Sequence, residues 1–206
     1  MKAVICLLMF FHMAIPFPAY AEPVNDIVID PGHGGYDSGI RAGGLTEKDI
    51  SLSTAKELEA VLKDRWKRVA LTRKTNRYLS IEERASFARG LAAVVFISLH
   101  ATESGNFVIY VTKYPDSNAP PRQHYALSSR QRDYLPMSKT LSARIGDAIK
   151  KEFGINVSLR EMPLAVLNPI KGAAVLIESP ITGLNDDGDR RIAEAIARGI
   201  QQYEGR

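Results

Sequence analysis

The chain has 206 residues, of which 45% are hydrophobic, a length and composition typical of one globular domain with a core, with or without tails. It carries 27 lysine and arginine residues against 23 aspartate and glutamate residues, for a formal net charge of +4. This mild excess fits an anionic environment such as a cell envelope, but it gives no basic stripe, so we expect no nucleic-acid partner.

The segment 1–21 has the pattern of a secretory signal peptide, and we expect a single domain over 22–206. Lys2 supplies a positive start, the apolar run "AVICLLMFFHMAIPF" follows, and "AYA" at 19–21 is a small-x-small cleavage site. A membrane anchor is the alternative, but the run is short for a span and has prolines near its exit. We therefore expect an exported protein, periplasmic or extracellular, whose mature form lies outside the membrane.

Strand-like and helix-like patterns alternate along the rest of the chain. This alternation favours a three-layer α/β sandwich. In chain order, the patterns predict a strand at 26–30, a helix at 47–65, a strand at 68–73, a helix at 80–92, strands at 93–101 and 106–114, a polar loop at 115–136, a helix at 137–154, strands at 163–168 and 173–179, and a helix at 186–204.

Three features give detail to these elements. Thr46 with Asp49, and Ser80 with Glu83, have the spacing of a capping box at the start of the first two helices. The strand at 93–101 is apolar along nearly its whole length, which is typical of a central strand covered on both faces. The proline-bearing loop has a length usually reserved for functional or mobile segments.

The side chains that could bind a metal are few. Cys6, the only cysteine, lies in the signal, so the mature chain must use histidine, aspartate or glutamate and can form no disulfide. His33 follows "IVIDPG" and His100 follows "VVFISL", each at the carboxyl end of a predicted strand. Because sites in α/β sheets form beyond these strand ends, we expect both imidazoles to face one crevice. His124 lies in the polar loop and is interpreted as a surface residue.

Two glutamates occupy related places. Glu47 opens the first helix, just after the glycine-rich loop of His33, and Glu178 ends the strand "AAVLIE". His33, Glu47 and His100 make a three-ligand set with an open fourth position, as catalytic zinc sites do, so we expect Zn²⁺ as the cofactor. Glu178 is then an unliganded carboxylate that takes a proton from water and delivers it to a leaving nitrogen.

Each residue taken singly has a plainer interpretation. His33 could bond its own backbone, His100 could be a satisfied histidine at a sheet edge, and Glu47 could be a favourable charge at a helix N-terminus. Glu178 could pair with Arg190. Their joint placement at strand ends favours the metal site. The run "GHGG" could instead cradle a phosphate, but its spacing is not G-x-G-x-x-G and no lysine follows in P-loop position.

The motifs "IVIDPGHGGYDSG", "GGLTEKDISL", "VALTR", "LSIEERASFA", "VFISLHA" and "AAVLIE" occur in this order. In them the chain resembles the zinc-dependent N-acetylmuramoyl-L-alanine amidases of the amidase-3 type over nearly all of its mature length. The resemblance implies a mixed, mostly parallel sheet of about six strands flanked by helices. It also implies zinc at His33, Glu47 and His100, and Glu178 as the catalytic carboxylate. The substrate would be peptidoglycan, cut between the lactyl group of N-acetylmuramic acid and L-alanine. We also expect the catalytic domain at 22–206 to be a monomer.

The sequence departs from the family after Glu178, where "ESPITGLN" places Ser179 and Pro180 in a stretch that is usually glycine–aromatic. This departure leaves open a non-catalytic peptidoglycan-binding module on the same fold, and composition leaves open a zinc hydrolase of another amide. Some relatives cover the zinc with an inserted helix until an activator protein binds. The corresponding segment 113–136 is short and broken by prolines, so we expect no full autoinhibitory helix, and any activator is unidentified.

Overall fold

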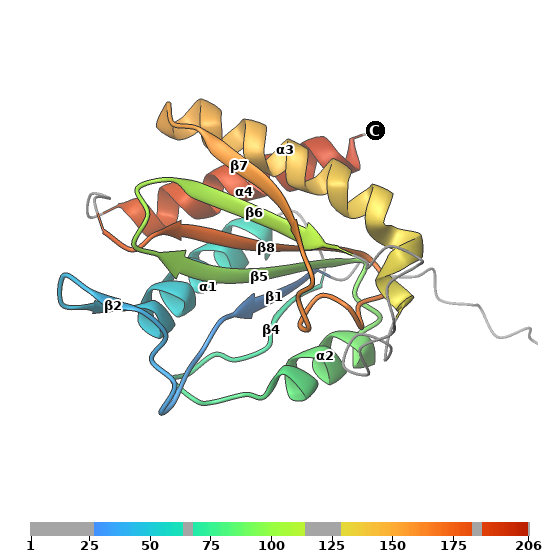
Figure 1. Ribbon diagram of the computed structural model, residues 1–206, viewed down its shortest axis with the longest axis horizontal. Coiled ribbons are helices and arrows are strands. Elements are labelled where there is room, and N and C mark those ends of the chain that lie inside the picture. The colour runs from blue at the N-terminus through green and yellow to red at the C-terminus, as the bar shows by residue number, and fades with distance from the viewer. Residues whose placement is uncertain (1–26, 64–67, 114–128, 183–186, 206) are drawn as a thin grey trace, which may run out of the picture.

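The computed structural model describes residues 27–63, 68–113, 129–182 and 187–205 (Figure 1). The expected signal peptide at 1–21 and His124 lie outside these ranges. The elements are β1 (Ile27–Pro31), β2 (Arg41–Ala42), β3 (Leu45–Thr46), α1 (Glu47–Lys63), β4 (Val69–Leu71), α2 (Ile81–Gly90), β5 (Val95–Thr102), β6 (Phe107–Thr112), the 3₁₀ helix η1 (Ser129–Tyr134), α3 (Leu135–Phe153), β7 (Val157–Met162), β8 (Ala173–Pro180) and α4 (Gly188–Glu204).

A six-stranded sheet with the order β4-β1-β5-β8-β6-β7 forms the middle of the molecule. Neighbouring strands are parallel except β6 and β8, which run antiparallel. The expected mixed, mostly parallel α/β sheet is therefore confirmed. β2 and β3 form a separate two-stranded hairpin that the sequence patterns did not predict, because each strand has only two residues.

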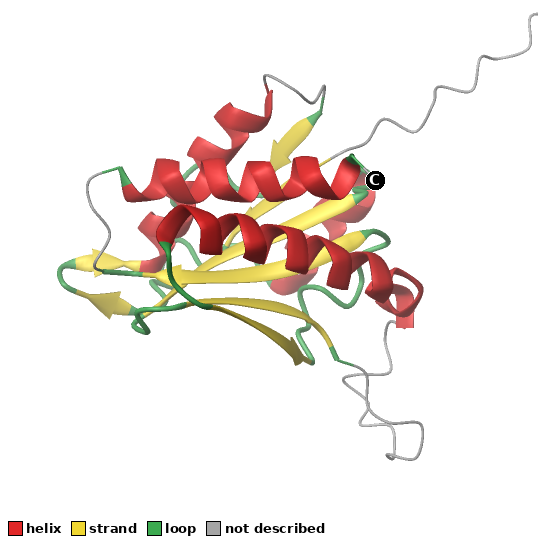
Figure 2. Cartoon of the chain, turned by 90° about the horizontal axis from the view of Figure 1, so that it is seen from above, coloured by secondary structure: helices red, strands yellow, loops and turns green. Residues whose placement is uncertain are grey.

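Helices α1, α3 and α4 lie together on one face of the sheet (Figure 2). Their apolar stripes pack on the alternate strand residues that point to that side. The members of this larger core include Ile29, Ile97, Ile109, Val175, Leu58, Ile145 and Ile196, each at most 1% exposed. Because α1 and α4 contact each other as well as the central strands, this face of the sheet is shielded from solvent.

The opposite face is covered by α2 and by the segment 164–170. Val28, Phe96 and Ala174 of the sheet pack here against Ala88 of α2 and Leu167. This covering layer is shorter than the other, and His100 and Glu178, near the carboxyl ends of β5 and β8, are only partly buried. The capping box predicted for α2 is present: Ser80 Oγ accepts a hydrogen bond from the backbone of Glu83, whose carboxylate accepts one from Ser80 N–H.

The strand predicted at 163–168 is wrong. These residues form turns, and the last strand before β8 is β7, which lies at the sheet edge beside β6. The apolar run is nevertheless buried, because Val166 and Leu167 pack on the sheet from outside it. A short apolar run indicates burial, either as a strand within the sheet or as a segment packed on its face. β7 exposes polar residues such as Arg160 because it is an edge strand.

The predicted loop at 115–136 is also partly wrong. Residues 114–128 lie outside the described ranges, but η1 and the start of α3 occupy 129–136. Gln131 fixes this segment, because its buried amide donates to the carbonyls of Ile170 (3.1 Å) and Gly172 (2.6 Å) and accepts from Ser138 (2.8 Å). No helix in the described part of the chain is both long and apolar enough to span a bilayer.

Candidate active site

His33 lies in the loop that follows β1, where its backbone adopts the left-handed conformation with φ of 57°. Its neighbours explain the glycines of this loop. A Cβ at Gly32 would lie 2.4 Å from the His100 ring, and one at Gly39 would lie 2.4 Å from Glu47 Oε2. Both contacts are shorter than side chains tolerate, so glycine at these two positions gives space to the site residues themselves.

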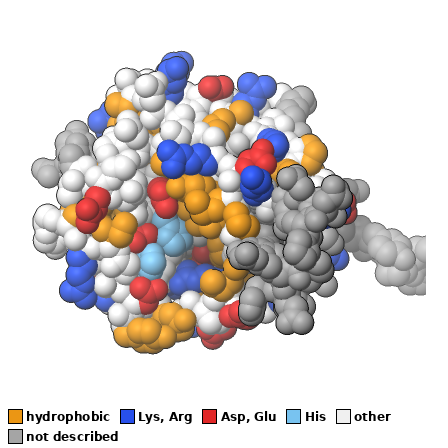
Figure 3. Space-filling model, in the orientation of Figure 1, with side chains coloured by type: hydrophobic (Ala, Val, Ile, Leu, Met, Phe, Trp, Pro, Cys, Tyr) orange, Lys and Arg blue, Asp and Glu red, His pale blue; other side chains and the backbone are white. Residues whose placement is uncertain are grey.

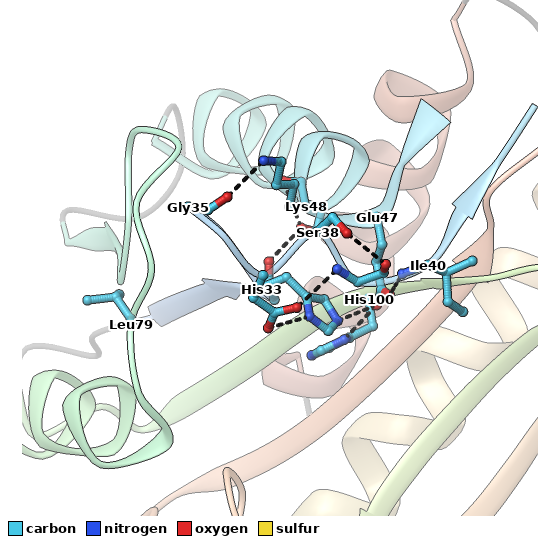
Figure 4. Close-up of polar contacts among 12 residues, drawn as sticks. His33, Gly35, Ser38, Ile40, Glu47, Lys48, Leu79 and His100 are labelled. Carbon is cyan, nitrogen blue, oxygen red and sulfur yellow. Dashed lines mark hydrogen bonds and ion pairs between the residues drawn. The ribbon is translucent and has the colours of Figure 1, made fainter. Parts of the chain in front are cut away.

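Glu47 brings the two histidines together (Figure 4). Its Oε1 atom lies 3.0 Å from His33 Nε2 and 2.8 Å from His100 Nδ1. The two imidazole rings are 5.0 Å apart between centroids, and one donor atom from each of the three residues lies within 4.8 Å of the others. The sequence prediction that His33, Glu47 and His100 converge on one point therefore agrees with the geometry.

The second oxygen of Glu47 and the far nitrogen of His33 are each held by another group. Glu47 Oε2 accepts a hydrogen bond from the Ile40 N–H (2.9 Å), which leaves Oε1 facing the imidazoles. His33 Nδ1 lies 2.8 Å from Asp37 Oδ2. A carboxylate on the outer nitrogen of a histidine fixes the ring and its tautomer, as it does for metal-ligating histidines.

The ionisation states follow from these contacts. Burial by itself would raise the pKa of Glu47, but hydrogen bonds from His100 and His33 outweigh it and hold this pKa well below its ordinary value. The hydrogen bond with Glu47 raises the pKa of His33 against the lowering effect of burial, and Asp37 raises it further. The carboxylate of Glu47 is therefore ionised at neutral pH, as a metal ligand must be.

This donor set fits a zinc ion. It offers two imidazole nitrogens and one carboxylate oxygen from three separate segments, with a carboxylate behind one imidazole. Two histidines and one acidic residue, with a fourth position left for water or substrate, are the protein ligands of a catalytic zinc class. The residues present therefore suit the metal that the sequence predicts.

Glu178 lies on β8 directly opposite His100 of β5 in the parallel register. Side chains paired in this way point to the same face of the sheet. Tyr110 of β6, which is 7% exposed, donates its hydroxyl to Glu178 Oε2 at 3.2 Å. The alternative pairing of Glu178 with Arg190 is wrong, because the Arg190 guanidinium contacts Glu194 of its own helix at 3.1 Å.

Tyr110 is a neighbour of the site that the sequence patterns did not identify. Burial raises its phenol pKa, and the charge of Glu178 raises it further, while Arg160 opposes both. The phenol therefore stays protonated at neutral pH and donates to the carboxylate. No sequence signal marks this role, because a tyrosine in the apolar run "NFVIYVTKY" resembles any other core residue.

Arg84 of α2 is a buried arginine that holds the loop of His33. The sequence patterns did not identify it either. Its guanidinium donates to Asp30 Oδ1 (2.8 Å), to the Pro31 carbonyl (2.6 Å) and to the His33 carbonyl (2.8 Å). Asp30 is 1% exposed and also accepts from Thr72 and Ser98. Arg84 therefore fixes the backbone on both sides of Gly32.

Arg73 supports the same loop from the α1 side. It is 1% exposed, and it donates to the carbonyls of Pro31 (3.0 Å), Gly32 (2.7 Å) and Lys48 (2.7 Å). Burial lowers the pKa of this arginine to about 10, with the charge of Arg84 adding to the effect. The guanidinium remains charged at neutral pH and ties the His33 loop to the first turn of α1, which carries Glu47.

A cavity of about 310 Å³ opens beside the histidines. Its walls are the His33 loop, the segment 78–81 and the segment 164–166, with Leu176 of β8 between them. Figure 3 shows the histidine side chains near the middle of this face, beside a hollow bordered by hydrophobic groups. A larger cavity of about 480 Å³ lies between α2 and Ile170, and none of the four predicted site residues lines it.

Comparison with known proteins gives consistent matches. The family model described as N-acetylmuramoyl-L-alanine amidase, Amidase_3, matches residues 27–202. The probable N-acetylmuramoyl-L-alanine amidase AmiB of Haemophilus influenzae is 46% identical over 107 residues, which are 50% of this chain and 24% of that protein. The sporulation-specific N-acetylmuramoyl-L-alanine amidase of Bacillus subtilis is 38% identical over 98 residues, 46% of this chain and 38% of that protein. The matched region thus spans less than two fifths of either relative.

Among solved structures, N-acetylmuramoyl-L-alanine amidase AmiC2 of Nostoc punctiforme superposes with a TM-score of 0.71 at 27% sequence identity. The match covers 87% of this chain and 97% of that one. The fold is therefore shared over most of the chain.

Proposed function

Because the chain belongs to the amidase-3 family of N-acetylmuramoyl-L-alanine amidases, we propose that it hydrolyses peptidoglycan. The bond cut is the amide between the lactyl group of N-acetylmuramic acid and the L-alanine of the stem peptide. The observation that carries the proposal is the convergence of His33, Glu47 and His100 from three separate segments at the edge of an open cavity.

His33, Glu47 and His100 are the residues that would hold a zinc ion. A zinc ion bound there supplies Lewis-acid chemistry, since it polarises a carbonyl group and makes water a stronger acid. Asp37 keeps the His33 ring turned toward Glu47, and Arg73 and Arg84 keep the backbone of the loop in place. The chain therefore holds its ligands ready before a substrate arrives.

Glu178 is the residue proposed to move the proton. Its carboxylate takes a proton from the attacking water and delivers it to the amide nitrogen that leaves with the stem peptide. The register places it on the strand next to His100, and the Tyr110 hydroxyl holds one of its oxygens. The other oxygen is free of that bond and is the one available for the proton.

We further propose that the protein works outside the cytoplasm, since peptidoglycan lies there. We also propose that it is a monomer. The expected signal peptide supports this location, and the names of the curated relatives, which include a probable cell wall amidase of Staphylococcus epidermidis, agree with it. If an activator protein acts on this chain, its identity is not part of the proposal.

Incubation of the purified protein with intact sacculi tests this function. Free stem peptides are expected among the products, a chelator should stop their release, and Glu178→Gln should abolish it. The matched control is Glu194→Gln, which changes a carboxylate on α4 behind the sheet and should leave release unchanged. Metal analysis should find zinc in the wild type and in Glu178→Gln, and a loss in His33→Ala and His100→Ala.

One outcome contradicts the proposal: full metal content with no peptide release from any muropeptide. Sedimentation with sacculi would then favour the non-catalytic wall-binding module. Release of an acetyl group or cleavage of an ordinary peptide bond would instead identify a zinc hydrolase of another amide.

A further inference from the structure

Two tyrosine rings stack on the surface next to the site, and together they form what we call the tyrosine ledge. Tyr36 and Tyr78 lie 4.5 Å apart between ring centroids, with 24° between their planes. Tyr36 is 81% exposed and Tyr78 is 42% exposed. The two residues come from segments more than forty positions apart in the sequence, so the stack is a product of the fold.

The backbone on both sides of the ledge is fixed. The Gly35 N–H donates to Asn76 Oδ1 (2.8 Å), and the Gly35 carbonyl accepts from Lys48 Nζ (2.9 Å). Arg84 joins the two segments from beneath, since it donates to the carbonyls of His33 (2.8 Å) and Leu79 (3.2 Å). The ledge is therefore preorganised, and a ligand that stacks on it has little loop entropy to overcome.

The ledge is continuous with the active site. Tyr78 lines the same 310 Å³ cavity as His33 and His100. Tyr36 lies three residues after His33 in the loop that carries this ligand. A ligand that extends out of the cavity past His33 on this side meets the two phenol rings first.

The chemistry of the ledge suits a sugar. A pyranose ring has faces made of C–H bonds and a rim of hydroxyl groups. The flat face of a tyrosine packs against such C–H bonds, while the phenol hydroxyl stays in water and can bond the rim. A tyrosine also presents this area with only two side-chain torsions to order. Exposed apolar groups that lie together beside a cavity commonly mark a binding site.

We propose that the tyrosine ledge binds a pyranose ring of the glycan strand next to the scissile amide. This inference rests on the proposed function, because it assumes that the substrate joins a glycan to a peptide. The glycan then leaves the site on the side of Tyr36 and Tyr78, and the stem peptide occupies the cavity toward segment 164–166. Contacts to the sugar hold the amide in position for hydrolysis.

A binding measurement tests the ledge without chemistry. The probe is a peptide-free tetrasaccharide of alternating N-acetylglucosamine and N-acetylmuramic acid, titrated by calorimetry into the full chain. Tyr36→Ala is expected to weaken binding by about tenfold, the upper range for an aromatic stacking contact, and Tyr36→Phe should keep it. Phe87→Ala removes an exposed aromatic of α2 outside the ledge and should bind as the wild type does.

A kinetic measurement separates the two halves of the substrate. With a disaccharide-tripeptide, Tyr36→Ala should lower kcat/KM by about tenfold. With a lactyl-tripeptide that lacks the sugar, the same variant should match the wild type. Equal losses on both substrates would overturn the proposal and assign Tyr36 a structural role, and no loss on either would overturn it as well.

The two proposals can fail separately. Hydrolysis of both substrates without dependence on Tyr36 would overturn the proposal that the ledge binds a sugar and would support the amidase function. Binding of the tetrasaccharide that depends on Tyr36, with no hydrolysis of either substrate, would support the sugar-binding ledge and overturn the proposed amidase function. A wild-type dimer that Tyr36→Ala dissociates in sedimentation would show that a second copy covers the rings, and would overturn the sugar assignment.

Discussion

The His33 ring is held at both nitrogens, by Glu47 on the inner side and by Asp37 on the outer side, at 3.0 Å and 2.8 Å. A carboxylate behind a ligating imidazole fixes its orientation and raises its basicity. Asp37 is thus as much a part of the proposed metal site as the ligands, although it binds no metal itself.

Asp37→Asn is expected to weaken zinc binding by roughly tenfold to a hundredfold, because the amide keeps the shape of the side chain but loses its charge. Competition against a zinc-binding dye would measure this change. The matched control is Asp147→Asn, an exposed position on α3, which should bind zinc as the wild type does. Equal affinity in Asp37→Asn would show that the outer contact of His33 has no part in metal binding.

Tyr110→Phe is expected to lower kcat by roughly tenfold with KM little changed, because it removes one donated hydrogen bond to Glu178 and keeps the ring in the core. Steady-state kinetics on a soluble muropeptide would measure both constants. Tyr134→Phe, a phenol at the end of η1, is the control. An unchanged kcat in Tyr110→Phe would mean that Glu178 needs no positioning by the phenol.

The residues of the site divide into those that sequence patterns reveal and those that they do not. His33, His100 and Glu178 stand out because each follows or ends an apolar run at the end of a strand, and Glu47 stands out because it opens the helix after the glycine-rich loop. Arg73 and Arg84 do not, because most of their partners are backbone carbonyls, which any sequence has. Their burial follows from tertiary contacts that no local period records.

At the scale of elements, α3 and α4 are joined by a cluster around Glu152. Its carboxylate accepts from Arg191 (2.9 Å) and Arg198 (2.7 Å). The hydrogen bond from Arg191 is the main reason that the pKa of Glu152 is lowered, with the charge of Arg198 adding to it. Because the pKa of Glu152 is lower in the folded chain than its ordinary value of 4.5, the cluster stabilises the fold at pH values above 4.5. This stabilisation is lost as the pH falls through the lowered pKa.

Glu152→Gln is therefore expected to reduce the free energy of unfolding by about 0.5–1 kcal/mol at pH 7, a modest value because the three side chains are partly exposed. The difference from the wild type should shrink as the pH falls below 4.5. Urea unfolding at several pH values would measure it. A difference that stays constant down to the lowest pH would rule out the charge of Glu152 as its cause.

Most elements follow from the sequence because strand and helix periods alternate clearly along it. The error at 163–168 has a physical reason: Pro163 and Pro169 bracket an apolar run, and the run is buried as a cover on the sheet face. β7 was missed for the opposite reason, since an edge strand with exposed Arg160 and Glu161 lacks the apolar character of its neighbours.

For the molecule as a whole, the proposed metal site connects segments that are far apart in the chain. His33, Glu47 and His100 belong to the β1 loop, α1 and β5, which all contact the same core. An ion bound by all three stabilises the folded state over the unfolded one by mass action. The effect is about 2.7 kcal/mol when free metal is one hundred times the dissociation constant.

Removal of zinc by a chelator is thus expected to lower Tm by about 5–10 °C, given the usual scaling for a chain of this size. Differential scanning calorimetry with and without chelator would measure the shift. His100→Ala should have the lower Tm from the start and show no further shift on chelation. A wild-type Tm indifferent to chelator would show that no ion links these segments.

The clamp that Arg73 and Arg84 place on the carbonyls of residues 31–33 has a consequence for how the protein is made. A nascent chain that ends with α1 contains His33 and Glu47, but it lacks both arginines that hold the carbonyls of the loop. Arg73 and Arg84 follow the end of α1 by about ten and twenty residues, and His100 follows them. The proposed set of ligands and catalytic carboxylate is therefore complete only after nearly the whole chain has been made, and shorter fragments are expected to be inert toward peptidoglycan.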